Sequence, residues 1–254
     1  MTSEAIPNGE ATPRILIVRL GAIGDLLRAS PIPQVLREQF PHAHIVWLVE
    51  PSGAPVIHAN PDVDEVIPFE RGPAWRALLR TGKLRTLCRD IHALSEELRA
   101  RRFEIAIDVQ GDFLSGLLTR LSGAPRRIGP RPAGDGNRYF MTERVDRPAH
   151  ATRITQANLH LLAPLGITIT PRRPLLAVPE DERVTAREVL LARGLAPGER
   201  YAACCTTASL LQKDWVWARW GELADMLWER AGLRTVFLGK LEKRVDALRL
   251  VEGH

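Results

Sequence analysis

The chain has 254 residues, a formal net charge of +5, 45% hydrophobic residues and 26% charged residues, which is the composition of a folded globular protein with one large domain or two small ones. Its longest apolar runs are far too short to cross a bilayer, and residues 1–13 lack the apolar core of a secretory signal, so we expect them to form a disordered polar tail. The three cysteines suit neither a disulfide framework nor a zinc site, which favours a reducing cytoplasm.

Apolar runs alternate with amphipathic stretches along residues 14–170. This rhythm predicts strands and helices in turn, which is typical of an α/β domain with a mostly parallel sheet covered by helices on both faces. The expected strands are residues 14–18, 44–50, 65–69 and 104–109, with a short strand near Ile128. The expected helices are residues 25–39, 52–59, 75–102, 112–122 and 150–165.

The alternation of apolar and amphipathic stretches is interrupted and then resumes in the last third of the chain. Residues 166–181 contain three prolines and little helical periodicity, so we place an interdomain linker at 171–180. The following helices are expected at 181–193, 217–231 and 241–251, and the strands at 201–205 and 234–239. Because a parallel sheet normally needs more than two strands, residues 181–254 are expected to form an incomplete second α/β domain.

The stretch "GAIGD" (21–25) follows the first expected strand. It lacks the third glycine of the dinucleotide-binding fingerprint, and Asp25 would repel a pyrophosphate at the helix N-terminus. Two interpretations of Asp25 remain. It is either a plain helix N-cap, which the local sequence favours, or a general base that takes a proton from a sugar hydroxyl. The helix dipole stabilises a carboxylate in both cases.

The stretch "DVQGDFLS" (108–115) follows another expected strand. Gln110 and Ser115 are hydrogen-bonding side chains suited to a polyol, and Gly111 would let the backbone approach such a ligand.

A third polar cluster lies in residues 204–220. Thr206 and Thr207 follow a strand, and Lys213 precedes a helix. Hydroxyls, backbone amides and an ammonium group that converge in this way suit a diphosphate.

Asp62 and Asp64 spell the Asp-x-Asp motif with which some glycosyltransferases hold a metal. We assign no metal here, because these acids precede the strand at 65–69 instead of following a strand.

Residues 71–102 carry nine Lys or Arg against three acids. This charge attracts phosphates or an anionic membrane face, or it is simply the solvated surface of an arginine-rich helix. Nucleic acid is not expected as a partner, because the stretch contains one aromatic residue, Trp75, and no binding motif.

Together these segments resemble glycosyltransferase family 9, the ADP-heptose:lipopolysaccharide heptosyltransferases. The resemblance covers about residues 14–254, and "VFLGKLEKR" is similar to the family's strand and turn that follow the donor segment. The segments that carry it, in the family's order and spacing, are "RILIVRLGAIGDLLRASPIPQVLREQFPHAHIVWLVE", "NPDVDEVIPF", "FEIAIDVQGDFLSGLLTRLSGAPRRIG" and "KDWVWARWGELADML".

The resemblance implies a GT-B fold of two Rossmann-like domains, with the acceptor on residues 14–170 and the nucleotide sugar mostly on residues 181–254. It implies an inverting transfer without metal or cofactor, from ADP-heptose to an anionic glycolipid at the cytoplasmic face of the inner membrane. Asp25 then becomes the catalytic base, because proton removal needs a carboxylate. The expected acceptor-binding residues are Gly24, Gln110, Gly111 and Ser115. The expected donor-binding residues are Thr206, Thr207, Lys213 and Glu242.

The chain also departs from the family pattern. Leu114 stands where the family often has Lys, and Val216 replaces the usual Pro. Two extra residues lie between Thr207 and Lys213, and the family's later Asp-x-Gly-x-x-His stretch does not occur in these residues. Two alternatives therefore stay open: a family member with another nucleotide-sugar donor or polysaccharide acceptor, or a truncated, inactive module that binds an acceptor or partner.

Overall fold

The computed structural model of the protein describes residues 12–70, 84–206 and 215–239. The chain divides into two compact units, Met1–Glu180 and Asp181–His254, which are described separately here as unit 1 and unit 2.

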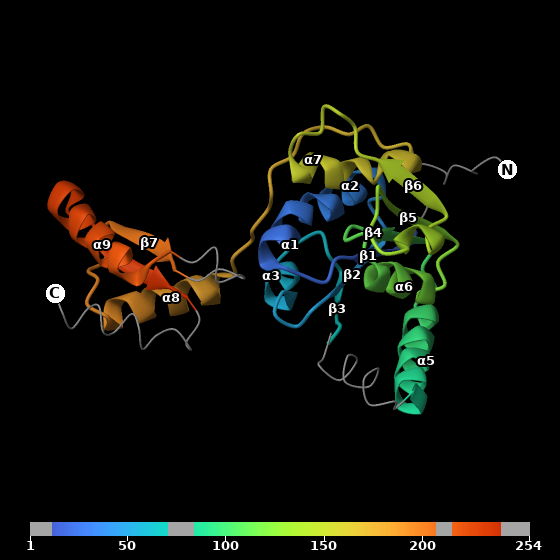
Figure 1. Ribbon diagram of the computed structural model, residues 1–254, viewed down its shortest axis with the longest axis horizontal. Coiled ribbons are helices and arrows are strands. Elements are labelled where there is room, and N and C mark those ends of the chain that lie inside the picture. Colours follow the sequence, from blue (N-terminus) through green and yellow to red (C-terminus); the bar gives the residue numbers. More distant parts are fainter. Residues whose placement is uncertain (1–11, 71–83, 207–214, 240–254) are drawn as a thin grey trace. The chain divides into compact units, whose positions relative to one another are not determined.

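The described part of unit 1 contains one sheet of six parallel strands, in the order β3-β2-β1-β4-β5-β6 (Figure 1). This confirms the predicted α/β class. The strands are β1 (Arg14–Val18), β2 (His44–Val49), β3 (Glu65–Pro68), β4 (Ile105–Asp108), β5 (Arg126–Arg131) and β6 (Glu143–Asp146).

The strand order reverses between β1 and β4, and ligands of open α/β sheets bind beyond the carboxyl ends of the strands at such a switch point. In the register of the sheet, Val18 at the end of β1 lies level with Asp108 at the end of β4 and with Leu48 of β2. The turns that follow β1 and β4 therefore begin side by side at one edge.

Helices cover both faces of this sheet (Figure 1). Ile15 and Ile17 of β1 belong to one core cluster, whereas Leu16 and Val18 belong to the other, so the run "RILIV" is buried on both sides as a central parallel strand requires. The first face carries α1 (Ile23–Ala29), α2 (Pro31–Gln39), α3 (Ala54–His58) and α7 (Ile154–His160), and the second carries α5 (Leu84–Ala100) and α6 (Phe113–Leu121). Two 3₁₀ turns, η1 (Asn137–Tyr139) and η2 (Ala163–Leu165), complete the described elements of unit 1.

Some element boundaries differ from those predicted. The helix expected at 25–39 is two helices that meet at Ser30, because Pro31 has no N–H with which to continue the hydrogen bonds of α1. The helix expected at 150–165 is the shorter α7 followed by η2. The first part of the helix expected at 75–102 lies outside the described residues, and α5 is described from Leu84 onward.

Within its described residues, unit 2 has a two-stranded parallel sheet of β7 (Tyr201–Cys205) and β8 (Arg234–Leu238), with α8 (Glu180–Ala192) and α9 (Trp217–Ala231). Trp220 of α9 packs edge-on against Phe237 of β8, with ring centroids 6.3 Å apart, and against Trp215 at 5.0 Å. The helix expected at 241–251 lies outside the described residues. Among the helices described in both units, none has the length and apolar character needed to span a membrane.

Candidate functional site at the carboxyl edge of the sheet

Two turns at the carboxyl edge of the unit 1 sheet are joined directly. The Leu20 N–H, in the turn after β1, donates a hydrogen bond of 3.0 Å to Oε1 of Gln110, in the turn after β4. The Leu20 carbonyl in turn accepts a hydrogen bond of 2.8 Å from the Glu50 N–H, which follows β2. The chain segments after three neighbouring strands thus hold one another in place at the switch point.

Asp25 lies in the first turn of α1 but is not its N-cap. The helix begins at Ile23, so Ala22 occupies the cap position, and the Asp25 N–H donates to the Ala22 carbonyl at 2.9 Å. The interpretation of Asp25 as the N-cap is therefore wrong, because the helix starts two residues earlier than predicted. Its carboxylate is left available for other contacts.

Two guanidinium groups hold the Asp25 carboxylate. Arg19 Nη2 lies 2.5 Å from Asp25 Oδ2, and Arg28 Nη1 lies 2.9 Å from Oδ1. The Arg19 side chain is only 15% exposed, whereas that of Asp25 is 35% exposed. A carbon atom added at Gly24 would meet nothing within 4 Å, so the surface next to Asp25 is open. The carboxylate is thus fixed from the protein side and accessible from solvent.

Asp108, the last residue of β4, organises the second turn, and sequence reasoning did not identify it. Its side chain is fully buried. Burial raises the pKa of the Asp108 carboxyl, and the hydrogen bonds donated to it act against that shift. The only local signal in the sequence is an acid at the end of the apolar run "IAID". The donors are the Gln110 N–H (2.9 Å), the Gly111 N–H (3.0 Å), the Ser115 hydroxyl (2.9 Å) and the Asn137 side-chain amide (2.6 Å).

The predicted acceptor-binding residues of this turn lie at different depths. Gln110 is half-buried, and its amide nitrogen donates to Asp112 at 2.5 Å. Ser115 is fully buried and forms a capping box with Asp112 at the start of α6, so its hydroxyl stabilises the turn and does not face the surface. Gly111 is also buried, beneath Pro130. Of the four residues expected to contact an acceptor, only Gly24 is exposed.

The predicted donor-binding residues lie in unit 2. Thr206 directly follows β7 and is buried, and its N–H donates to the Leu238 carbonyl at 2.9 Å, which extends the β7–β8 pairing by one residue. Thr207, Lys213 and Glu242 lie outside the described residues.

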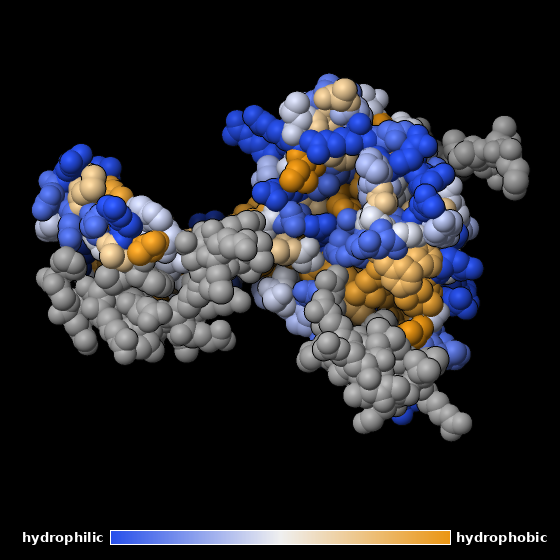
Figure 2. Space-filling view, in the orientation of Figure 1, coloured by the Kyte–Doolittle hydropathy of each residue, from blue (hydrophilic) through white to orange (hydrophobic). Residues whose placement is uncertain are grey.

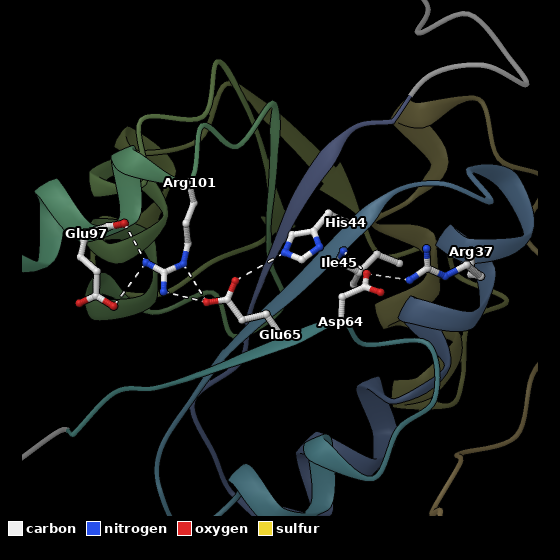
Figure 3. A network of polar contacts seen from close by, with 7 residues as sticks. All are labelled: Arg37, His44, Ile45, Asp64, Glu65, Glu97 and Arg101. Atoms are coloured by element: carbon white, nitrogen blue, oxygen red, sulfur yellow. Dashed lines mark hydrogen bonds and ion pairs between the residues drawn. The ribbon is translucent and has the colours of Figure 1, made fainter.

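Asp64 of the Asp-x-Asp motif contacts the start of β2, at the amino end of the sheet (Figure 3). Asp64 Oδ2 accepts a hydrogen bond of 2.7 Å from the Ile45 N–H and lies 2.7 Å from Arg37 Nη2. The Asp62 backbone carbonyl accepts a longer hydrogen bond of 3.4 Å from Arg37 Nη2, and the Asp62 N–H donates to the Asn60 side chain at 3.0 Å. Within the described ranges, no three or more His, Cys, Asp or Glu side chains are grouped so that they could hold a metal ion.

Part of the basic stretch 71–102 is neutralised within the fold. Arg101 Nη2 lies 2.7 Å from Glu65, and Arg101 Nη1 lies 3.3 Å from Glu97 (Figure 3). The Arg101 hydrogen bond lowers the pKa of the Glu65 carboxyl. Arg101 therefore joins α5 to β3 and does not add free charge to the surface. The basic residues Arg71, Arg76, Arg80 and Lys83 lie outside the described residues.

Solved structures share the fold of this chain. A glycosyl transferase family 9 protein from Veillonella parvula superposes with a TM-score of 0.77 at 23% identity, over 97% of this chain and 69% of that one. The Escherichia coli heptosyltransferase WaaC with ADP-2-deoxy-2-fluoro heptose superposes with a TM-score of 0.72 at 23% identity, over 94% and 73%. The fold is that of the GT-B type glycosyltransferases.

The sequence comparison identifies the family within this fold. Residues 91–253 match glycosyltransferase family 9 (heptosyltransferase), and the chain belongs to this family. Lipopolysaccharide heptosyltransferase 3 of Escherichia coli K12 is 26% identical over 82% of this chain and 58% of its own length. Lipopolysaccharide heptosyltransferase 1 of Pseudomonas aeruginosa is 25% identical over 94% of this chain and 65% of its own length. The chain thus spans about three-fifths of the length of these curated relatives.

Proposed function

We propose that this protein is an inverting, metal-independent glycosyltransferase that moves heptose from ADP-heptose to the inner core of lipopolysaccharide, with Asp25 as the general base. The observation that carries the proposal is the position of Asp25: it lies at the switch point of the sheet, is fixed by Arg19 and faces open surface beside Gly24. The names of the relatives support heptose transfer to lipopolysaccharide, and the WaaC structure with a fluorinated ADP-heptose supports the choice of donor.

The reaction is a single displacement. A hydroxyl oxygen of the acceptor attacks the anomeric carbon of the heptose, and Asp25 takes the hydroxyl proton as the new bond forms. The bond between the anomeric carbon and the β-phosphate oxygen breaks on the opposite side, and its electron pair leaves with ADP. Attack opposite the leaving group inverts the anomeric centre.

Arg19 is proposed as a positioning residue for Asp25. Its side chain is mostly buried, and its guanidinium forms an ion pair with Oδ2 of Asp25. The Arg19 carbonyl accepts a hydrogen bond of 3.1 Å from the indole of buried Trp47. Each carboxylate oxygen has two lone pairs, so Asp25 can still accept a hydroxyl hydrogen from the acceptor while Arg19 holds it.

The donor site is proposed on unit 2 and the acceptor site on unit 1. Thr206, Thr207 and Lys213 bind the diphosphate, and Lys213 stabilises the charge that develops on the departing ADP. Glu242 binds the nucleoside. Gly24 and Gln110 contact the acceptor sugar. In this proposal residues 14–170 and 181–254 form the two domains, with residues 171–180 as the linker.

The acceptor is proposed to be an anionic glycolipid, met at the cytoplasmic face of the inner membrane by the basic stretch 71–102. Reversing the charge of Arg80, Lys83 and Arg85 together is expected to weaken acceptor binding, and more strongly at low salt than at high salt. Binding that is unchanged by the reversal at every salt concentration would assign these residues to ordinary solvation.

Release of ADP from ADP-heptose tests the proposed function. The purified chain is mixed with a lipopolysaccharide inner-core acceptor that lacks the heptose, in the presence and absence of a metal chelator. We expect ADP release that depends on the acceptor, resists the chelator and exceeds the release from other nucleotide sugars. Faster release from a different nucleotide sugar would identify another donor. Acceptor binding without any release would indicate an inactive binding module.

A further inference from the structure

One face of α6 presents apolar and basic side chains in a single stripe. Phe113, Leu117 and Arg120 are spaced at i, i+4 and i+7, which places them above one another on a helix. Phe113 is 52% exposed, Leu117 is half-buried and Arg120 is exposed. Figure 2 shows apolar surface over the position of α6. Phe113 begins the helix directly after Asp112, so the stripe starts next to the Gln110 turn.

The 3₁₀ turn η1 extends this face. The ring of Phe140, just after η1, lies 5.3 Å from that of Phe113 in an edge-to-face contact. Gly116 leaves space for the Phe140 ring, since a side-chain carbon at position 116 would lie 2.7 Å from that ring. Tyr139 is 74% exposed, and the Arg138 guanidinium lies 4.8 Å from the centre of its ring. We name Phe113, Leu117, Arg120, Arg127, Arg138 and Tyr139 the α6–η1 surface.

The arginines of this surface carry positive charge that no acid balances within the described residues. The Arg127 guanidinium donates hydrogen bonds to the backbone carbonyls of Phe140 (2.8 Å) and Ala124 (2.6 Å), which carry no charge. Burial and the nearby charge of Arg120 lower the pKa of Arg127. Arg138 donates to the Tyr139 hydroxyl at 2.7 Å. The surface therefore combines exposed aromatic rings with uncompensated positive charge.

We propose that the α6–η1 surface rests on an anionic lipid bilayer, with Phe113 and Tyr139 inserted at the level of the headgroups. Aromatic side chains are favoured at that depth, an exposed apolar face gains by burial there, and arginines are attracted by acidic headgroups. This surface is separate from the basic stretch 71–102. Its value for catalysis rests on the proposed function, because a bilayer here would present a glycolipid next to the turn that contains Gln110.

Vesicle sedimentation with the full chain tests the proposal. The protein is spun with vesicles of phosphatidylglycerol and phosphatidylcholine, and with vesicles of phosphatidylcholine alone. We expect binding to the anionic vesicles, which weakens as salt rises. The Arg120→Glu variant should bind at least about fivefold more weakly, since one basic residue near an anionic surface contributes about that factor. Tyr139→Ser should also reduce binding at every salt concentration, because its contribution is apolar.

Matched control variants come from the opposite face of the sheet. Ile154 and Arg153, at the start of α7, are an exposed apolar residue and an exposed arginine with no place in the α6–η1 surface. Ile154→Ser and Arg153→Glu should leave vesicle binding unchanged. Phe113→Ser removes a ring contact, so its fold is checked by circular dichroism. Tyr139 is largely exposed, and its variant keeps the test valid if Phe113→Ser fails to fold.

Equal binding to both kinds of vesicle, or equal losses in the α6 and α7 variants, would overturn the proposal. A dimer in size-exclusion chromatography that Tyr139→Ser disperses, without any vesicle binding, would show that a second copy of the chain covers the surface. Heptose transfer to a soluble acceptor, measured alongside vesicle binding, distinguishes failure of the membrane proposal from failure of the proposed function. Activity that depends on Asp25 without vesicle binding removes the membrane proposal alone, whereas vesicle binding without activity removes the proposed transfer alone.

Discussion

The Leu20 N–H donates to Oε1 of Gln110 at 3.0 Å, and this one hydrogen bond joins the turn that leads to Asp25 to the turn that begins at Asp108. The two residues are 90 positions apart in the sequence. Gln110 thus sets the position of the β1–α1 turn, in addition to any contact it makes with an acceptor.

Replacing Gln110 with Ala should cost about 1 kcal/mol in the free energy of unfolding, because the Leu20 N–H loses its partner in a half-buried place. Urea unfolding measures this loss. Gln110→Glu offers a comparison, because its carboxylate can still accept from Leu20 but faces the Asp112 carboxylate, to which Gln110 now donates. A Gln110→Ala variant as stable as the parent would show that the hydrogen bond does not stabilise the turn.

Replacing Asp108 with Asn should destabilise unit 1 by about 3 kcal/mol, because one of the two carboxylate oxygens becomes an amide donor that faces other donors in a buried site. The variant Ser115→Ala removes one donor and should cost less, about 1 kcal/mol. Thermal unfolding of the two variants shows which substitution causes the larger loss of stability. A smaller loss for Asp108→Asn than for Ser115→Ala would mean that Asp108 is not the centre of this network.

Gly111 and Gly166 offer a matched pair of glycine substitutions. Both have left-handed backbone angles, with φ of +79° and +76°, but a side-chain carbon at Gly111 would lie 2.7 Å from Pro130 whereas one at Gly166 would meet nothing within 4 Å. Gly166→Ala should therefore cost only the backbone strain, about 1–2 kcal/mol. Gly111→Ala should cost clearly more. Equal losses in urea unfolding would show that Pro130 moves aside freely.

Glu65→Gln tests the ion pair with Arg101 through its pH dependence. Because Arg101 lowers the folded-state pKa of Glu65 below its ordinary value of 4.5, the pair stabilises the fold above that pH and loses this effect as the pH falls through the folded-state value. At neutral pH the variant should be less stable by about 1 kcal/mol, since the pair is partly exposed. The difference should shrink in acid. Glu97→Gln, at a more exposed partner of Arg101, is the control and should change little.

The sequence predicted the central strands well, since β1 and β2 are continuous apolar runs that only a buried strand or helix accommodates. It missed β6 because three of the four residues of "ERVD" are charged, and this strand forms through its pairing with β5. It identified the β1 and β4 turns as the candidate site. The burial of Gly111 and Ser115 could not be predicted, because Pro130 of β5 lies over Gly111, and Asn137 of η1 donates to the same Asp108 oxygen as the Ser115 hydroxyl. Local patterns do not report such contacts.

Asp25→Asn gives the most direct test of the proposed base. The variant keeps the shape of the side chain and removes its ability to accept a proton. Turnover of ADP-heptose with a heptose-free inner-core acceptor should fall by about 10²-fold or more, which is the usual effect of losing a general base. Calorimetric titration with ADP should give the same affinity for both proteins, because the donor site is proposed on unit 2. Arg28→Gln, which removes the exposed partner of Asp25, should retain most of the activity. Equal turnover in Asp25→Asn and the parent chain would contradict the assignment of Asp25 as the base.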